Sequence, residues 1–244
     1  MFPGIGTVLN ISTIIIGGTL GVFIGAKISE KLRNLIIDVL GCVTIISAAD
    51  ALSAYWDKEL TNAIPRGWVI IVIIFSLLIG ALIGTVLQIE DRLENLGESL
   101  KRRFSSSSGS NFVDGFVSAS LIFAIGPLAI LGSISDGMGT GIDQLVLKST
   151  LDGFTSLAFA ASLGWGVALS SLPVGIYQFI WTAIGLFLGS ILAGYQVAAM
   201  TAVGGVLLIG IALRLLRIKQ IAVGNLLPAL VLAPLLALAA HQFI

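Results

Sequence analysis

The sequence predicts an all-α, polytopic membrane protein with about eight transmembrane helices. Of its 244 residues, 57% are hydrophobic and only 11% are charged, whereas a soluble domain carries about 25% charged residues. The mean hydropathy is +1.06, so the chain has more apolar surface than a core of this size can bury. Eight stretches approach the roughly 20 apolar residues that a helix needs to cross a bilayer. The excess apolar surface is therefore expected to contact the lipid bilayer.

The eight predicted spans follow one another with polar loops between them. The N-terminal stretch has no positively charged region and no small-x-small cleavage site, so we interpret it as a retained span and not as a signal peptide. The fourth and fifth spans carry the most polar residues, and the seventh is short. The predicted spans are 4–26, 34–54, 68–88, 112–133, 146–171, 175–194, 197–214 and 221–242.

Basic residues predict the orientation of these spans, because Lys and Arg concentrate in cytoplasmic loops. Three loops, after the first, third and seventh spans, hold ten of the 13 basic residues. These loops lie on one side only if there are eight spans, which places both termini outside. The other side holds only Lys58 and Arg66. The ten basic residues are Lys27, Lys31, Arg33, Arg92, Lys101, Arg102, Arg103, Arg214, Arg217 and Lys219.

The long connection after the third span predicts an amphipathic helix. The stretch "IEDRLENLGESLKRRF" has helical spacing and is expected to lie along the cytoplasmic interface. A flexible linker, "SSSSGSN", follows it. The chain is thereby divided into a three-span group (1–88), the helix and linker (89–111) and a five-span group (112–244). The apolar face of the helix carries Ile89, Leu93, Leu96 and Leu100.

Two internal matches predict inverted-topology repeats, in which halves of opposite orientation build one transport site. Residues 114–133 match 152–171 after a shift of 38, and residues 21–52 match 185–216 without a gap after a shift of 164. The alternative is coincidence among Gly, Ala, Leu and Ile. The first match pairs Asp114-Gly115-Phe116-x-Ser118 with Asp152-Gly153-Phe154-x-Ser156.

Ionisable residues within a span are costly and are therefore functional candidates. Asp152 lies six residues into the fifth span, and Lys148 precedes it by one turn on the same face, so the two can pair. Asp114 is the matching acid of the fourth span. The two acids can bind a proton or a cation, and Lys148 can bind an anion. The sequence does not indicate which metal, if any, would bind. The alternative is an ion pair near the outer headgroups, with Asp114 in the cytoplasmic interface.

Other polar and helix-breaking positions extend this hypothesis. Ser118 and Ser156 are expected to line a polar seam, unless they serve only helix packing. Breaks at Gly126, Pro127 and Gly164 expose helix ends to a substrate in such folds, although a kink for packing is an equal alternative. Asp50 is an outlying candidate, for which an interfacial acid is the favoured alternative. Weaker candidates still are Asn10 and Asn225.

Glycines at helical spacing predict close helix contacts, either within the chain or in a homo-oligomer. They are Gly17, Gly18, Gly21 and Gly25 in the first span and Gly80 and Gly84 in the third.

The composition also argues against other classes of protein. With zero net charge, the chain has no basic field to attract nucleic acid. Cys42 is the only cysteine, which excludes an intramolecular disulfide and a cysteine-rich metal site. With His241 as the only histidine, there is no HExxH motif and no Ser–His or Cys–His pair, so we expect no enzyme and no cofactor. An aspartic membrane hydrolase using Asp114 and Asp152 is the remaining enzymatic alternative.

The segment "FAIGPLAILGSISDGM…LVLKSTLDGFTSLAFAASLGWGVALSSLPVGIYQ" (123–178) resembles the signature of a family of prokaryotic inner-membrane proteins, the YqgA/YdfK-like group of unknown function. The opening "GTVLNISTIIIGGTLGVFIG" and the segment "ISAADAL" are similar to it too. The resemblance implies a protein of the prokaryotic cytoplasmic membrane and supplies no activity. A fainter resemblance is to the repeated Asp-Ala-x-x-x-Ser-like element of manganese exporters and lysine-exporter-like proteins, from which this chain departs by Gly115 and Gly153.

The sequence therefore favours a secondary transporter of a small solute or ion. Asp114 and Asp152 are its predicted proton or cation site, and Lys148 is their partner. One alternative is a passive channel along the same polar seam. The other is a membrane scaffold that binds a partner through residues 89–104.

Overall fold

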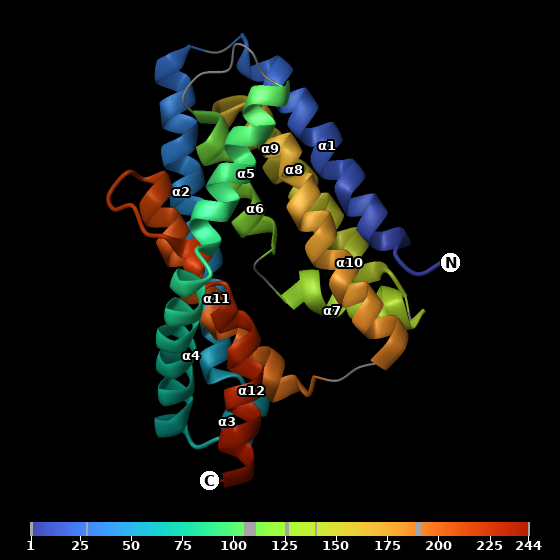
Figure 1. Cartoon of the computed structure of the whole chain (residues 1–244), viewed down its shortest axis with the longest axis vertical. Coiled ribbons are helices and arrows are strands. Elements are labelled where there is room, and N and C mark those ends of the chain that lie inside the picture. Colours follow the sequence, from blue (N-terminus) through green and yellow to red (C-terminus); the bar gives the residue numbers. More distant parts are fainter. Residues whose placement is uncertain are drawn as a thin grey trace. The chain divides into compact units, whose positions relative to one another are not determined.

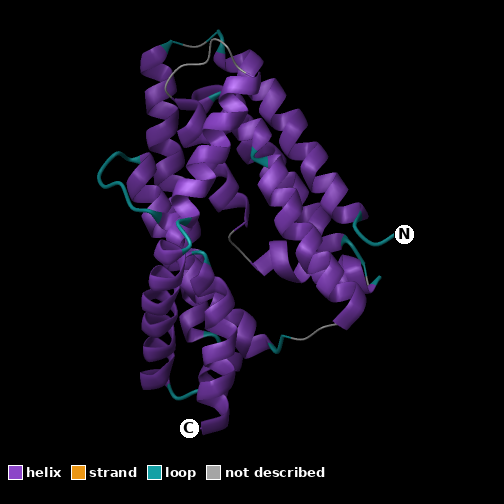
Figure 2. Ribbon diagram, in the orientation of Figure 1, coloured by secondary structure: helices purple, strands orange, loops and turns teal. Residues whose placement is uncertain are grey.

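The computed structural model describes residues 2–27, 29–104, 111–124, 127–139, 141–188 and 192–243, and it places them in helices joined by short loops (Figures 1 and 2). No strand occurs among these residues, which confirms the all-α prediction. The longer helices are α1 (Ile5–Gly25), α2 (Glu30–Ser53), α4 (Arg66–Val86), α5 (Ile89–Phe104), α6 (Asn111–Ala124), α7 (Pro127–Met138), α8 (Asp143–Leu163), α10 (Ser171–Leu188), α11 (Gly194–Leu215) and α12 (Pro228–Phe243). The short ones are η1 (Ala54–Trp56), α3 (Lys58–Ala63), α9 (Trp165–Leu169) and η2 (Val223–Leu226).

The chain is a multi-pass membrane protein. Six helical segments in the described ranges are long and apolar enough to cross a bilayer, and a seventh span results if the bent pair α6–α7 is counted as one. The fifth predicted span, which corresponds to α8, is not among these candidates. It has the length of a span, 21 residues, but Lys148, Asp152 and several hydroxyl side chains lower its hydropathy. The polar cluster described below accounts for that composition.

Two helix breaks change the predicted bounds of the fourth and fifth spans. The fourth span is not one straight helix, because α6 ends at Ala124, α7 begins at Pro127, and the two are bent by 61°. The fifth predicted span ran to residue 171, but α8 ends at Leu163 and residues 165–171 belong to the next span. Gly164 causes this second break with φ 80° and ψ −157°, a backbone region that is essentially restricted to glycine.

The described chain forms two compact units that interleave in sequence. The first unit contains residues 1–40 and 93–191, and the second contains residues 41–92 and 192–244. The predicted linker falls largely on residues 105–110, which lie outside the described ranges. The predicted amphipathic helix is confirmed as α5, whereas its position on the membrane surface stays a prediction.

The first unit is organised around a glycine-lined contact between α1 and α8. A Cβ added at Gly17 would lie 2.2 Å from the Gly153 oxygen, and one added at Gly25 would lie 2.2 Å from the Ala161 oxygen. Asn10 contacts Asp152, so residue numbers rise together along both helices. The helices are therefore parallel, and their backbones touch because no side chain separates them.

A second helix, α10, packs against α1 in the opposite direction. Asn10 contacts Gln178, and Thr7, which precedes Asn10, contacts Thr182, which follows Gln178. Helix α7 also packs against α10, where a Cβ at Gly137 would lie 2.0 Å from the Thr182 oxygen. Helix α1 is thus held between α8 and α10 over its first three turns.

The second unit is built from part of α2 together with α3, α4, α11 and α12. Its α4 glycines face the C-terminal segment, since a Cβ at Gly80 would lie 2.6 Å from the Ala229 nitrogen and one at Gly84 would lie 1.9 Å from the Asn225 oxygen. The predicted glycine faces of both units therefore pack within the chain. This finding removes the reason to assign them to a homo-oligomer.

Large apolar side chains remain exposed on the outer faces of these helices, where they contact lipid in a membrane protein. Examples within the candidate spans are Phe23 (63%), Ile46 (69%), Leu82 (68%) and Phe187 (81%).

We predict that Gly17→Ala destabilises the protein by about 1–3 kcal/mol, as overpacking of a tight core does. The added Cβ would lie 2.2 Å from the Gly153 oxygen and 2.4 Å from the Ser156 hydroxyl oxygen, so α1 and α8 must separate. The measurement is thermal unfolding in detergent. Gly67→Ala is the control, because a Cβ there meets nothing within 4 Å. Equal melting temperatures for both variants would contradict the α1–α8 contact.

Candidate functional site

A hydrogen-bonded cluster of four polar side chains lies inside the first unit. Lys148 Nζ donates to Asp152 Oδ2 over 2.7 Å. Asn10 Nδ2 donates to the same carboxylate oxygen over 3.0 Å and to Gln178 Oε1 over 3.3 Å. We call these four residues the polar cluster. It joins α8, α1 and α10.

The helix arrangement explains how the cluster forms. Lys148 and Asp152 are four residues apart on α8 and therefore lie one above the other on the same face. The parallel contact with α1 brings Asn10 level with Asp152, and the antiparallel α10 brings Gln178 to the other side of Asn10. The sequence predicted the ion pair, and the structure adds the two amides.

The cluster is buried almost completely. The residues Lys148 and Asp152 are 6% and 7% exposed, and Asn10 and Gln178 are 0% exposed. Removing two charges from water costs several kcal/mol for each ion, and the attraction between them offsets part of that cost. The ion pair is therefore buried within the protein, and its depth in the membrane stays a prediction.

Two atoms of the cluster lack a hydrogen-bond partner. They are Asn10 Oδ1, an acceptor, and Gln178 Nε2, a donor. In most native proteins such buried groups are paired with protein, water or an ion. Each unsatisfied group costs about 1–3 kcal/mol, so these two atoms are the part of the cluster that the described side chains leave without a hydrogen bond.

A second buried carboxylate of the first unit lies one turn away along α1. The Gly6 amide donates to Asp136 Oδ2 over 3.0 Å, and Asp136, on α7, is 3% exposed. Gly4, at the start of α1, supplies no side-chain cap. Asp136 therefore supplies the missing acceptor and places a negative charge at the positive end of the α1 dipole.

Thr7 and Thr182 lie between this carboxylate and the polar cluster. Their hydroxyl oxygens are 3.4 Å apart, longer than the usual 2.5–3.0 Å or so of a hydroxyl hydrogen bond. The first turns of α1 thus present a continuous polar face in the interior of the unit.

The predicted serine and acid residues have different surroundings. Ser156 donates to the Ile14 and Gly153 oxygens at 3.2 and 2.9 Å, so its hydroxyl supports the α1–α8 contact and not a ligand. Ser118 is buried. Asp114, in the first turn of α6, and Asp50, on α2, are both exposed, so the structure does not bury either acid beside Asp152.

The predicted helix breaks lie near the positions expected. Gly164 separates α8 from α9, and Pro127 begins α7. Gly126 lies outside the described residues.

A second buried ion pair occurs in the second unit. Glu90 Oε1 accepts from Arg214 Nη1, and Glu90 Oε2 accepts from the Gly224 amide over 2.6 Å. Asn225 Oδ1 accepts from the Glu90 amide over 2.9 Å. These contacts fasten the start of α5 to the end of α11 and to η2, and they satisfy both carboxylate oxygens, so we assign this pair to structure.

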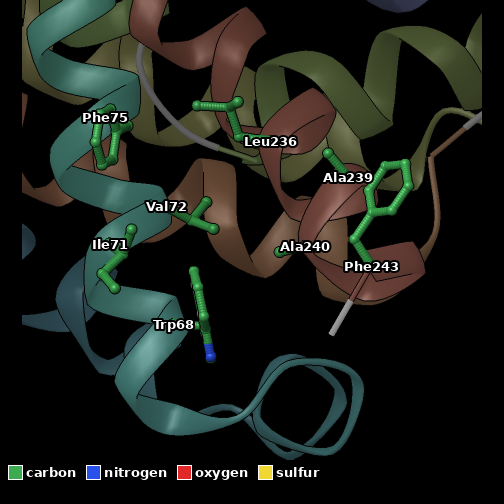
Figure 3. Close-up of a pocket in the computed structure, with 8 residues that line it drawn as sticks. All are labelled: Trp68, Ile71, Val72, Phe75, Leu236, Ala239, Ala240 and Phe243. Carbon is green, nitrogen blue, oxygen red and sulfur yellow. The ribbon is translucent and has the colours of Figure 1, made fainter.

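No other feature of the described chain competes as a polar site. No group of three or more His, Cys, Asp or Glu side chains that could hold a metal ion occurs within the described ranges. A pocket of about 430 Å³ in the second unit is lined by α4 and α12 and is apolar (Figure 3). Its lining residues are Trp68, Ile71, Val72, Phe75, Leu236, Ala239, Ala240 and Phe243.

Sequence reasoning missed Gln178, Asp136 and Thr182. Gln178 and Thr182 are four residues apart on one face of α10, a polar stripe in an apolar span, and that spacing could have indicated them. Asp136 follows the break at Pro127, in the stretch that the predicted spans assign to the outer loop after residue 133.

Comparison with known proteins gives a family but no activity. A family profile described as "Protein of unknown function (DUF554)" matches residues 5–238, so the chain belongs to this family. It is 28% identical over 238 residues to the uncharacterised membrane protein YdfK of Bacillus subtilis, covering 98% of this chain and 97% of YdfK. It is also 28% identical over 233 residues to the uncharacterised protein YqgA of Escherichia coli, covering 94% of each. No solved structure matches the chain significantly.

We predict that Asp136→Ala lowers the free energy of unfolding by about 1–3 kcal/mol, since it leaves the buried Gly6 amide without an acceptor. Asp38→Ala, at an exposed position on α2, should change it by less than about 0.5 kcal/mol. Thermal unfolding in detergent measures both. If the two variants unfold at the same temperature, Asp136 does not cap α1.

Proposed function

We propose that this member of the DUF554 family is a secondary transporter of a small solute or ion in the prokaryotic cytoplasmic membrane. The carrying observation is the polar cluster, a lysine–aspartate pair buried among three helices of a membrane protein. Charges at such positions are rare in membrane proteins and typically mark substrate paths or proton relays. Helices of a bundle also commonly build their binding sites from inward-facing side chains.

The parallel contact of α1 and α8 supports eight spans with α8 as the fifth. If α1, α2, α4 and the bent pair α6–α7 each cross the membrane, α8 crosses in the same direction as α1. The antiparallel contact of α1 and α10 agrees with α10 as part of the sixth span. The proposed topology places both termini outside and the basic loops in the cytoplasm.

Helix bounds support the shorter repeat. With a shift of 38, the break between Ala124 and Pro127 falls on positions 162 and 165, and α8 ends at Leu163 while α9 begins at Trp165. Gly164 falls at the second of these helix ends, and its match, Gly126, lies outside the described residues. Helix ends therefore fall at matching positions of the two copies, within the bent pair α6–α7 and between α8 and α9.

Reciprocal contacts support the longer repeat. With a shift of 164, the start of α2 at Glu30 falls on the start of α11 at Gly194. A Cβ at Gly41 would lie 2.7 Å from Leu216 Cγ, and one at Gly205 would lie 2.8 Å from Leu52 Cγ. Because the shift relates Gly41 to Gly205 and Leu52 to Leu216, these are two copies of one contact, as a two-fold axis produces. The two helices run antiparallel there, which suits an inverted repeat.

The ion pair offers a simple means of coupling. Asp152 Oδ2 accepts from both Lys148 and Asn10, so a proton on this carboxylate weakens both contacts at once. Such a change alters how α8 is held to α1. Proton binding and the packing of two spans are thereby linked, which is the requirement for coupled transport. Asp114 and Asp50, both exposed, stay predictions as secondary ion contacts.

Two alternatives remain distinct from a carrier. A passive channel would use the same polar face without saturation or coupling. A scaffold would use α5 as a docking helix and would tolerate changes at Asp152. That the chain is no enzyme is likewise our proposal, based on the absence of any catalytic His or Cys arrangement in the sequence.

We predict that Lys148→Met and Asp152→Asn each destabilise the protein, by about 3–5 kcal/mol, because each leaves a buried charge unpaired. The double variant should recover most of that stability and still lack transport. The measurements are thermal unfolding and then uptake into proteoliposomes of the solutes that raise the wild-type melting temperature.

The Lys148→Met, Asp152→Asn double variant distinguishes a role of the ion pair in transport from a role in structure alone. A folded double variant that transports as well as the wild type would show that the ion pair is structural only, and the transport site would have to lie elsewhere. Deletion of residues 93–104 serves as the comparison, because the scaffold alternative alone expects that change to abolish function.

A further inference from the structure

The ionised Asp152 determines which groups of the polar cluster donate hydrogen bonds and which accept them. A carboxylate only accepts hydrogen bonds, so the Asn10 side chain must turn its nitrogen to Asp152. Its two amide protons then serve Asp152 Oδ2 and Gln178 Oε1. The carboxylate therefore determines the orientation of the Asn10 amide, which in turn determines that of the Gln178 amide. In these orientations Asn10 Oδ1 and Gln178 Nε2 have no hydrogen-bond partner.

One of these two atoms is an acceptor and the other is a donor, and a carboxamide carries the complementary donor and acceptor. Two carboxamides can pair through two hydrogen bonds, in which each nitrogen donates to the other oxygen. Asn10 and Gln178 make only one of the two, from Asn10 Nδ2 to Gln178 Oε1 at 3.3 Å. The second donor and the second acceptor are left for a third molecule that carries one acceptor and one donor.

The charge balance of the cluster limits that molecule to an uncharged one. Lys148 and Asp152 neutralise each other over 2.7 Å, so an ion bound beside them would remain an uncompensated buried charge. Asp136 does not change this balance at the cluster, because its carboxylate is bonded to the Gly6 amide at the positive end of α1.

We propose that the polar cluster binds an uncharged small molecule with a carboxamide-type head, whose oxygen accepts from Gln178 Nε2 and whose N–H donates to Asn10 Oδ1. The inference rests on the proposed function and names the substrate class of that transporter. Binding completes the hydrogen bonding of two buried groups, which is how a polar site rejects analogues that lack one of the partners.

Matched pairs of probes test the class. Urea and guanidinium share one shape, as do acetamide and acetate, and benzamide and benzoate, but only the first of each pair is uncharged. The measurement is the melting temperature of the purified full-length protein in detergent. At a probe concentration about tenfold above the dissociation constant, an uncharged probe should raise the melting temperature of the wild type by about 2–5 °C. The same probe should not raise the melting temperature of Gln178→Met.

Gln178→Met removes the donor and should abolish that shift. Gln196→Met is the matched control, because Gln196 is also buried but has both ends satisfied, by the Pro234 oxygen and the Ala193 amide. The Gln196→Met variant should have a lower melting temperature than the wild type, and an uncharged probe should still raise that temperature by the same amount. Uptake of the responding amide into proteoliposomes should fall at least tenfold in Gln178→Met.

Three results would overturn the inference. If amides shift the wild type and Gln178→Met equally, they bind elsewhere and a buried water satisfies the two atoms. If none of the probes shifts the wild type, no such ligand is recognised. If only the charged probes shift it and Asp152→Asn removes their effect, the transporter proposal stands and the uncharged class is wrong.

Discussion

Burying a lysine and an aspartate inside a membrane protein is the constraint on which the first unit depends. The pair is tolerable only if its charges neutralise each other and its remaining polar atoms find partners. That requirement brings Asn10 of α1 to Asp152, and it needs the glycine face of α1 so that the two helices can touch. The glycines and the charges therefore depend on each other. The glycines allow α1 and α8 to approach closely, and this approach lets Asn10 donate a hydrogen bond to Asp152.

The two buried ion pairs of the described chain show how differently such pairs can be used. In the second unit, Glu90 has both carboxylate oxygens engaged, by Arg214 and by the Gly224 amide, and these contacts join the ends of helices. In the first unit, the hydrogen bonds lead from Lys148 through Asp152 and Asn10 to Gln178 and end on unpartnered atoms.

The all-helical fold and most of its spans could be predicted from the sequence because apolar spans and glycine faces leave strong signals. The ion pair was visible as two charges four residues apart in a hydrophobic run. What could not be predicted was which neighbours would complete the site, since Asn10, Gln178 and Asp136 lie on three other helices and only tertiary packing brings them near α8 or α1. The repeat hypothesis matches Asp114 to Asp152, but the packing buries Asp152 and leaves Asp114 exposed.

The proposed transport site requires that α8 is a membrane span and that the polar cluster lies inside the bilayer. Single cysteines test this in a Cys42→Ser background: Asp143→Cys at the start of α8, Trp165→Cys just after its end, and Lys219→Cys as a cytoplasmic reference. A membrane-impermeant maleimide added to intact cells should label position 143, and should label 165 and 219 only after permeabilisation. Labelling of 143 and 165 from the same side would mean that α8 does not cross the membrane, and would contradict the transport site proposed here.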